Sequence, residues 1–271
     1  MTVLNERILY DRFYELHRQN LCIFENEYGQ AVYSAGAPLW VKLNTAVNAR
    51  SFFYTFLREK LALVFDEFVI APEVARECAE VYKELRGGVC TLREMLALYL
   101  PNDVPLPIEV VLPDVFSQGV QAGMLTTAND MADYTFLYKG LRAFGEEVFG
   151  SAPAGSGVSA GVAGSAVSVQ EVQEEIPPLF VYKPAPNFPP VAMGSLTHGA
   201  EFRRLNLIYT PKENRRRGYG NAVVSALCAL VRSEGKIPVL YVYEDNAAAV
   251  KLYQGLGFAE AGQVTEVRVG N

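Results

Sequence analysis

Histidine, tryptophan and paired cysteines are scarce in this sequence. Its 271 residues include 2 His, 1 Trp and 4 Cys. The cysteines form no C-x-x-C pair and have no nearby histidine at ligand spacing; they are Cys22, Cys78, Cys90 and Cys228. This scatter indicates neither a zinc site nor a disulfide framework, so we expect free thiols and no metal.

The sequence also lacks a long apolar run and an excess of basic residues. No run approaches the about 18 apolar residues that a membrane-spanning helix requires, and the charges in MTVLNERILYDRF do not fit a signal peptide. The net charge of −6 argues against a general nucleic-acid-binding protein. We therefore expect a cytoplasmic protein without a membrane or nucleic-acid partner, and the oligomeric state stays open.

Two segments of unusual composition divide the chain. Half of the residues are hydrophobic, and the length suits one large domain or two domains with separate cores. Residues 101–113 contain four prolines and predict a boundary between domains at 1–112 and 117–271. Residues 150–168 consist almost entirely of Gly, Ala, Ser and Val, which predicts a flexible loop. A lid over a substrate is the alternative for this loop.

The first half shows an α+β alternation without a motif of recognisable chemistry. Hydrophobic periodicity and turn residues predict helices at 5–19, 44–58 and 73–85. The same signals predict strands at 21–24, 31–34, 39–43, 61–70 and 94–100.

The second half reads as a sheet with helices around it. Thr127 is the expected cap of a helix, with a second short helix at 143–149. Strands are predicted at 119–125, 179–183, 191–197 and 203–209, the last three as an antiparallel meander. A helix from Gly220 to Gly235 then leads to a buried, parallel strand at 237–243. A helix capped by Asn246 and two closing strands follow, at 258–261 and 264–269, joined by a turn at Gly262-Gln263.

The sequence TPKENRRRGYG has the features of a phosphate-binding turn. A strand ends at Tyr209, and three arginines and two glycines lead into an amphipathic helix. The start of a helix offers unpaired N–H groups and a favourable dipole to an anion. Gly218 and Gly220 let the ligand approach the backbone, and Arg215–Arg217 add positive charge.

Two motifs together resemble the GCN5-related N-acetyltransferase (GNAT) family, and more narrowly its FR47-like branch. The family's pyrophosphate motif, Q/R-x-x-G-x-G/A, is matched by Arg215, Gly218 and Gly220. The second motif, N-x-x-A/S-x-x-x-Y-x-x-x-G-F, is matched less strictly, by Asn246, Ala249, Tyr253, Gly257 and Phe258. The resemblance covers residues 117–271.

The resemblance implies an α+β fold of the GNAT type, with a mixed, mostly antiparallel sheet flanked by helices. Residues 1–112 would then be either a separate α+β domain or a degenerate copy of the same fold. Acetyl-CoA would be the co-substrate, and no metal is implied.

The resemblance also implies which residues form the site. Backbone N–H groups of the arginine-rich turn would hold the pyrophosphate, and the edge of the preceding strand would pair with the pantetheine arm. The expected cofactor-binding residues are Leu207, Ile208, Tyr209, Arg215, Arg216, Arg217, Gly218, Tyr219, Gly220, Asn221 and Asn246. Tyr253 would be the catalytic residue that protonates the departing thiolate.

The implied function is transfer of an acetyl group from acetyl-CoA to a primary amine by direct attack, on a small molecule or a peptide. The alternative is a catalytically silent, CoA-binding regulatory or interaction protein. The general base is left unassigned among four acidic residues, which are Glu201, Glu244, Asp245 and Glu266.

Overall fold

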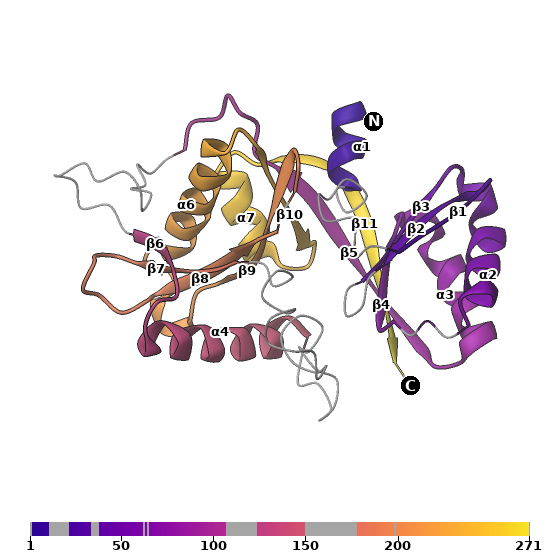
Figure 1. Ribbon diagram of the computed structural model, residues 1–271, viewed down its shortest axis with the longest axis horizontal. Helices are drawn as coiled ribbons and strands as arrows, with labels where there is room; N and C mark the ends of the chain where they lie inside the picture. The colour runs from indigo at the N-terminus through magenta and orange to yellow at the C-terminus, as the bar shows by residue number, and fades with distance from the viewer. Residues whose placement is uncertain are drawn as a thin grey trace. The chain divides into compact units, whose positions relative to one another are not determined.

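The computed structural model describes residues 2–10, 22–33, 38–61, 63, 65–106, 124–149, 178–197 and 199–270 (Figure 1). These residues belong to two compact units. Unit 1 comprises Met1–Leu98, Tyr241–Val250 and Glu260–Asn271, and unit 2 comprises Tyr99–Leu240 and Lys251–Ala259. The predicted boundary at 112–117 and the predicted loop at 150–168 lie outside the described residues, so both stay predictions.

Unit 1 is built on a mixed sheet in the order β1-β2-β3-β4-β11-β5. The antiparallel pairs are β1 with β2, β2 with β3, and β4 with β11, whereas β3 and β4 are parallel. The strands are β1 (Cys22–Asn26), β2 (Gly29–Tyr33), β3 (Leu39–Leu43), β4 (Glu67–Ile70), β5 (Val89–Tyr99) and β11 (Ala259–Gly270).

Helices α2 (Ala49–Glu59) and α3 (Pro72–Arg86) of unit 1 pack on an aromatic core. Helix α1 (Val3–Leu9) and the short 3-10 helix η3 (Ala46–Asn48) also belong to this unit. Phe52, Phe53 and Phe56 of α2 are fully buried with Phe68 of β4. Proline at the first position of α3 fits a helix start, because its missing N–H would have no intrahelical partner there.

Unit 2 has a meander with one helix on each face. Its strand order is β10-β9-β8-β7-β6, in which β10 is parallel to β9 and the other pairs are antiparallel. The strands are β6 (Met124–Thr127), β7 (Leu179–Lys183), β8 (Ala192–Leu196), β9 (Phe202–Tyr209) and β10 (Ile237–Tyr243). The predicted meander and the parallel strand are confirmed.

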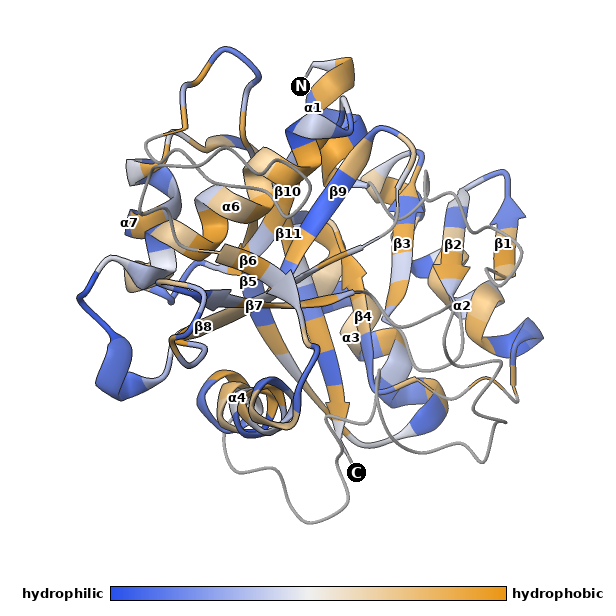
Figure 2. Ribbon diagram, turned by 60° about the vertical axis from the view of Figure 1, so that its left-hand side comes forward, coloured by the Kyte–Doolittle hydropathy of each residue, from blue (hydrophilic) through white to orange (hydrophobic). Residues whose placement is uncertain are grey.

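Helices α4 (Met131–Phe149) and α6 (Tyr219–Ser233) lie on opposite faces of these strands (Figure 1). A Cβ atom at Gly194 would meet Leu227 of α6, whereas one at Gly140 of α4 would meet Met193. Neighbouring residues of β8 therefore face different helices, as the period of two in a strand requires. Figure 2 views α4 nearly end-on, with hydrophobic and hydrophilic residues around it.

Several local predictions were wrong. The helix predicted at 5–19 ends at Leu9, with Tyr10 as its C-cap, and residues 11–19 lie outside the described residues. The strand predicted at 61–70 begins at Glu67. Residues 131–149 form one helix, because Gly140 makes room for the side chain of Met193 instead of ending the helix. The cap of this helix is Asp130, whose Oδ1 accepts a hydrogen bond from the N–H of Asp133 at 2.8 Å, and not Thr127. The two closing strands are the single strand β11, because Gly262 continues the strand where a turn was expected.

Candidate functional site

The turn between β9 and α6, here called the arginine turn (Thr210–Gly218), leads to a row of backbone donors. Inside it, the 3-10 helix η5 (Lys212–Asn214) is closed by bonds from Asn214 N to Pro211 O and from Arg215 N to Lys212 O. The first bond of α6 runs from Ala222 N to Gly218 O at 3.0 Å. No bond to another described residue engages the N–H groups of 216–221. These donors are available to a ligand.

The backbone of the arginine turn adopts two left-handed conformations. Gly218, which precedes α6, has a φ of 82°, and Arg216 has a φ of 59°. Glycine takes this conformation without steric cost, whereas arginine does not. The strain at Arg216 is therefore maintained by the surrounding contacts.

The two motif glycines have different surroundings. A Cβ atom at Gly218 would meet no atom of another described residue within 4 Å, so the described residues leave the space beside it open. A Cβ atom at Gly220 would lie 2.9 Å from Cδ1 of Leu252 in helix α7 (Ala247–Gly255). Gly218 thus leaves room for a ligand, whereas Gly220 allows α7 to pack closely against the start of α6.

The three arginines also differ. Nε of Arg215 donates to the carbonyl of Thr210 at 2.8 Å, and its Nη2 lies 2.6 Å from a carboxylate oxygen of Glu147. Arg216 and Arg217 are exposed, and neither forms an ion pair with another described residue. Arg215 is therefore committed to the protein, and the two that follow it are free to attract an anion.

Strand β9 contains a bulge where it approaches the arginine turn. Asn206 is opposite Ser195 and Tyr209 is opposite Met193, so two residues of β9 face one residue of β8. Leu207, inside the bulge, has a φ of 52°. A bulge re-aims the side chains and backbone groups around it, which separates Ile208, close to Gly194 and α6, from Tyr209, close to α4.

The other edge of β9 is paired over only part of its length. The parallel pairing joins Phe202–Arg204 to Ile237–Val239 and does not continue to Leu205 and Leu240. The last residues of β9, which include the expected pantetheine-binding residues 207–209, therefore have an edge that can accept an extended ligand.

Asn246, from the second motif, caps a helix. Its Oδ1 accepts a hydrogen bond from the N–H of Ala249 at 3.2 Å at the start of α7. Asn246 is exposed. Its observed contact is thus structural, and its expected contact with the cofactor stays a prediction.

Tyr253 is more enclosed than the sequence indicates. Its side chain is 7% exposed, and its ring packs against Phe258 with a centroid distance of 5.6 Å. Burial, with a smaller contribution from Cys228, raises the pKa of the Tyr253 hydroxyl. The group therefore stays protonated at neutral pH, but it is a weaker proton donor than an exposed tyrosine.

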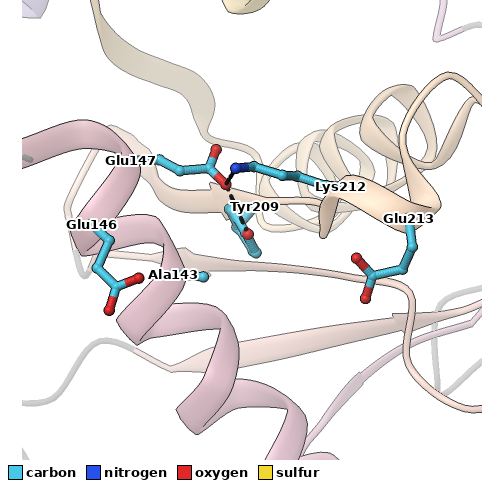
Figure 3. Close-up of a pocket in the computed structure, with 6 residues that line it drawn as sticks. All are labelled: Ala143, Glu146, Glu147, Tyr209, Lys212 and Glu213. Carbon is cyan, nitrogen blue, oxygen red and sulfur yellow. Dashed lines mark hydrogen bonds and ion pairs between the residues drawn. The ribbon is translucent and has the colours of Figure 1, made fainter.

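A hollow of about 350 Å³ lies beside the arginine turn (Figure 3). It is lined by Ala143, Glu146, Glu147, Tyr209, Lys212 and Glu213. Three of these side chains are carboxylates and one is an ammonium group, so the lining is acidic. Glu147 is a residue that the sequence analysis missed; the acidic end of the helix at 143–149 was the available signal.

The candidate bases are in different surroundings. Asp245 forms an ion pair with Arg93 at 2.8 Å. Glu266 is 6% exposed, and its carboxylate accepts hydrogen bonds from Nε of Arg268 and from the hydroxyl of Tyr243. Arg93 also lies over the ring of Tyr243, at 3.6 Å from its centroid.

We call the group of Tyr243, Glu266, Arg268 and Glu67 the polar cluster of unit 1. Nη2 of Arg268 lies 3.4 Å from a carboxylate oxygen of Glu67. Burial raises the pKa of Glu67 to about 7, with a further contribution from Glu266 that Arg268 opposes. Burial and Glu266 also raise the pKa of Tyr243. The cluster is thus a network in which each charged side chain has a partner.

In the part of the chain that the structure describes, no group of three or more His, Cys, Asp or Glu side chains is placed to hold a metal ion. No described helix is both long and apolar enough to cross a membrane.

A known protein family matches the C-terminal part of the chain, which carries the site. Residues 195–269 match the family described as FR47-like protein. This segment contains the arginine turn, α6, α7 and Tyr253. No curated protein matches the sequence.

Solved structures share the fold over nearly the whole chain. A functionally unknown conserved protein from Staphylococcus epidermidis has a TM-score of 0.60 at 11% identity, with 94% of this chain and 96% of that chain covered. A GCN5-related N-acetyltransferase from Kribbella flavida has a TM-score of 0.56 at 12% identity, with 100% and 97% covered. A GCN5-related N-acetyltransferase-like protein from Streptococcus suis has a TM-score of 0.52 at 11% identity, with 97% and 92% covered.

These findings confirm the predicted fold class and the resemblance to the GNAT superfamily and its FR47-like branch. The likeness of fold also extends over the N-terminal half, which the motifs left without a relative.

Proposed function

We propose that this protein, whose residues 195–269 match the FR47-like family, is an acetyl-CoA-dependent N-acetyltransferase acting on a primary amine. The observation that carries the proposal is the row of N–H groups at 216–221 that no other described residue bonds, next to a space at Gly218 that the described residues leave open. Consecutive donors at a helix start suit a pyrophosphate, because they meet several anionic oxygens at once.

The residues at the start of α6 fit the pyrophosphate of CoA. The N–H groups of 216–221 would donate to its oxygens, and Arg216 and Arg217 would add charge without losing an ion pair to any described residue. Arg215 would act indirectly, because its guanidinium is already bound to Thr210 and Glu147.

Strand β9 would hold the pantetheine arm and orient the thioester. Its edge at 207–209 would pair with the extended arm, as a peptide adds to the edge of a sheet. A backbone N–H at the bulge, near Ile208 or Tyr209, would polarise the thioester carbonyl. Acetyl-CoA would supply an activated acetyl group, and a neutral amine oriented beside it would displace the thiol.

Tyr253 would hold the proton that the departing thiolate receives. Burial keeps its hydroxyl protonated, which this role requires. The acceptor would be a small molecule or a peptide that carries a primary amine.

One observation favours the second candidate, a CoA-binding regulatory or interaction protein without turnover. Tyr253 is only 7% exposed, and a buried hydroxyl with a raised pKa donates its proton less readily. In that case the arginine turn would bind CoA and the second motif would serve only to pack α7.

The test combines acetyl-CoA binding with release of thiol across a panel of primary amines. We expect the unmutated protein to bind acetyl-CoA and to release thiol with at least one amine. Tyr253→Phe should lower kcat at least about tenfold while the acetyl-CoA affinity stays unchanged. Binding without turnover on any amine would support the regulator, and absence of binding would refute both candidates.

A further inference from the structure

Glu147 of helix α4 contacts Tyr209, the residue before the arginine turn, and Lys212 within the turn (Figure 3). Its Oε1 accepts a hydrogen bond from the hydroxyl of Tyr209 at 3.2 Å, and its Oε2 accepts one from Nη2 of Arg215 at 2.6 Å. Nζ of Lys212 lies 3.9 Å from Oε1. A single carboxylate thus contacts the last residue of β9 and two residues of the turn that follows.

Arg215 extends this connection into the backbone. Its Nε donates to the carbonyl of Thr210 at 2.8 Å, and its guanidinium carbon lies 5.6 Å from the ring centroid of Tyr209. Arg215, the residue before Arg216, is thus held at two points: by Thr210 at the beginning of the turn and by Glu147 of α4. Bonds between an ionised donor and an ionised acceptor are the stronger class of protein hydrogen bond.

The arginine turn needs such support from outside. The bonds of η5 stop at Arg215, and the next residue, Arg216, adopts a left-handed conformation that arginine does not prefer. The strained conformation lies immediately before the row of unbonded N–H groups. Whatever holds Arg215 therefore also determines where those donors point.

We propose that Glu147 is a positioning residue for the donor site: through Arg215 and Tyr209 it fixes the arginine turn in the conformation that binds the CoA pyrophosphate. This inference rests on the proposed function, since it assigns a supporting role at the same site. Glu147 itself makes no contact with CoA in this arrangement and acts through Arg215.

The ionisation state of Tyr209 is consistent with this role. Burial, and then the neighbouring Glu147 carboxylate, raise the pKa of the Tyr209 hydroxyl. Tyr209 therefore keeps the proton that it donates to Glu147 over the whole neutral range.

The test is the acetyl-CoA affinity of Glu147→Ala, Glu147→Gln and Glu146→Ala, measured by calorimetry. We expect Glu147→Ala to raise the Kd about tenfold and Glu147→Gln to raise it less, because glutamine keeps one acceptor. Glu146 lines the same hollow but is ion-paired with Arg142, at 3.4 Å, so Glu146→Ala is the matched control and should stay within about twofold.

A double-mutant cycle with Arg215→Ala separates positioning from a general loss of structure. If Glu147 acts through Arg215, the double variant should bind acetyl-CoA about as weakly as the single variant with the lower affinity. If the two residues act independently, the losses of binding free energy in the two single variants should add. The exchanged pair Glu147→Arg with Arg215→Glu should recover part of the affinity. Circular dichroism of each variant reports whether it folds.

The two proposals fail in different ways. Unchanged affinity in Glu147→Ala, or additive losses in the cycle, would overturn the positioning role while acetyl-CoA binding by the unmutated protein stands. If the unmutated protein does not bind acetyl-CoA, the proposed function fails, and the positioning role fails with it.

Discussion

The arginine turn of unit 2 and the polar cluster of unit 1 both contain arginines, but they differ in how many of their polar groups are already bonded within the protein. In the polar cluster, Arg268 contacts Glu266 and Glu67, and the Tyr243 hydroxyl completes the shell of Glu266. At the arginine turn, Arg216, Arg217 and the N–H groups up to Asn221 have no bonded partner among the described residues. Satisfied polar groups stabilise a fold, whereas accessible groups left unsatisfied can bind a ligand.

The comparison teaches where each region is sensitive. A substitution at the arginine turn should change ligand affinity with little change in stability. A substitution in the polar cluster should instead change stability, because it leaves a half-buried charge without its partner. Three changes test this difference.

The largest effect is expected from Gly218→Leu. The backbone has room for a Cβ there, so the added side chain would occupy the space of the ligand and weaken acetyl-CoA binding about a hundredfold, roughly 2.7 kcal/mol. Gly235→Leu is the matched control. Gly235 also has a positive φ, of 71°, and nothing within 4 Å of its Cβ position, but it follows the other end of α6.

Calorimetry measures the acetyl-CoA affinity of the two variants, and thermal unfolding measures their stability. Both should lose similar stability, because leucine is equally disfavoured at each φ, and only Gly218→Leu should lose affinity. Equal acetyl-CoA affinity in the two variants would remove the arginine turn from the binding site.

A smaller effect is expected from Arg268→Met in the polar cluster. It would leave the buried Glu266 facing Glu67 without the intervening cation, which should cost about 2 kcal/mol of unfolding free energy. Arg50→Met is the control in the same unit. Arg50 pairs with Glu84 at 2.6 Å, but both side chains are about half exposed, so its loss should cost less than about 0.5 kcal/mol.

Urea unfolding of the two variants, followed by circular dichroism, gives the difference. Equal destabilisation by Arg268→Met and Arg50→Met would show that the polar cluster is no more than a set of surface pairs.

The smallest effect is expected in the pH dependence of Glu67→Gln. The folded pKa of Glu67, about 7, is above its ordinary value of 4.5, so the folded state binds this proton more tightly than the unfolded state. Its contribution to stability is therefore fully present below about pH 4.5 and is lost as the pH rises through about 7. Glutamine cannot ionise, so above pH 7 the variant should gain on the order of 1 kcal/mol relative to the unmutated protein.

Unfolding free energies of both proteins between pH 4 and pH 8 measure this effect, because titrating groups outside the polar cluster contribute equally to each. Curves that stay parallel across this interval would contradict the burial of Glu67.

Local patterns were enough to predict much of the fold. The strand at 237–243 is a continuous apolar run and the strand at 179–183 is apolar up to Lys183, and the structure has both at the predicted residues. The family motifs likewise led to α6 and α7. In each case the signal lies within a short stretch of the sequence.

The sequence was not enough to predict contacts between residues that are far apart in the chain. Gly262 resembles a turn residue, yet it lies inside β11, a strand whose sheet neighbours β4 and β5 are distant in the sequence. Glu147 meets Tyr209 and Arg215 across 62 and 68 residues. No pattern around Glu147 indicates that contact. Gly220 matches a ligand-binding motif, yet its close neighbour is Leu252.

The place of β11 in unit 1 has a consequence for synthesis on the ribosome. Strand β4 emerges early, but β11, its antiparallel partner, is translated only after almost all of unit 2. A nascent chain therefore exposes one edge of β4 for most of its elongation, although N-terminal domains ordinarily fold first. Chaperones that shield strand edges would have their longest opportunity to act on this protein at β4.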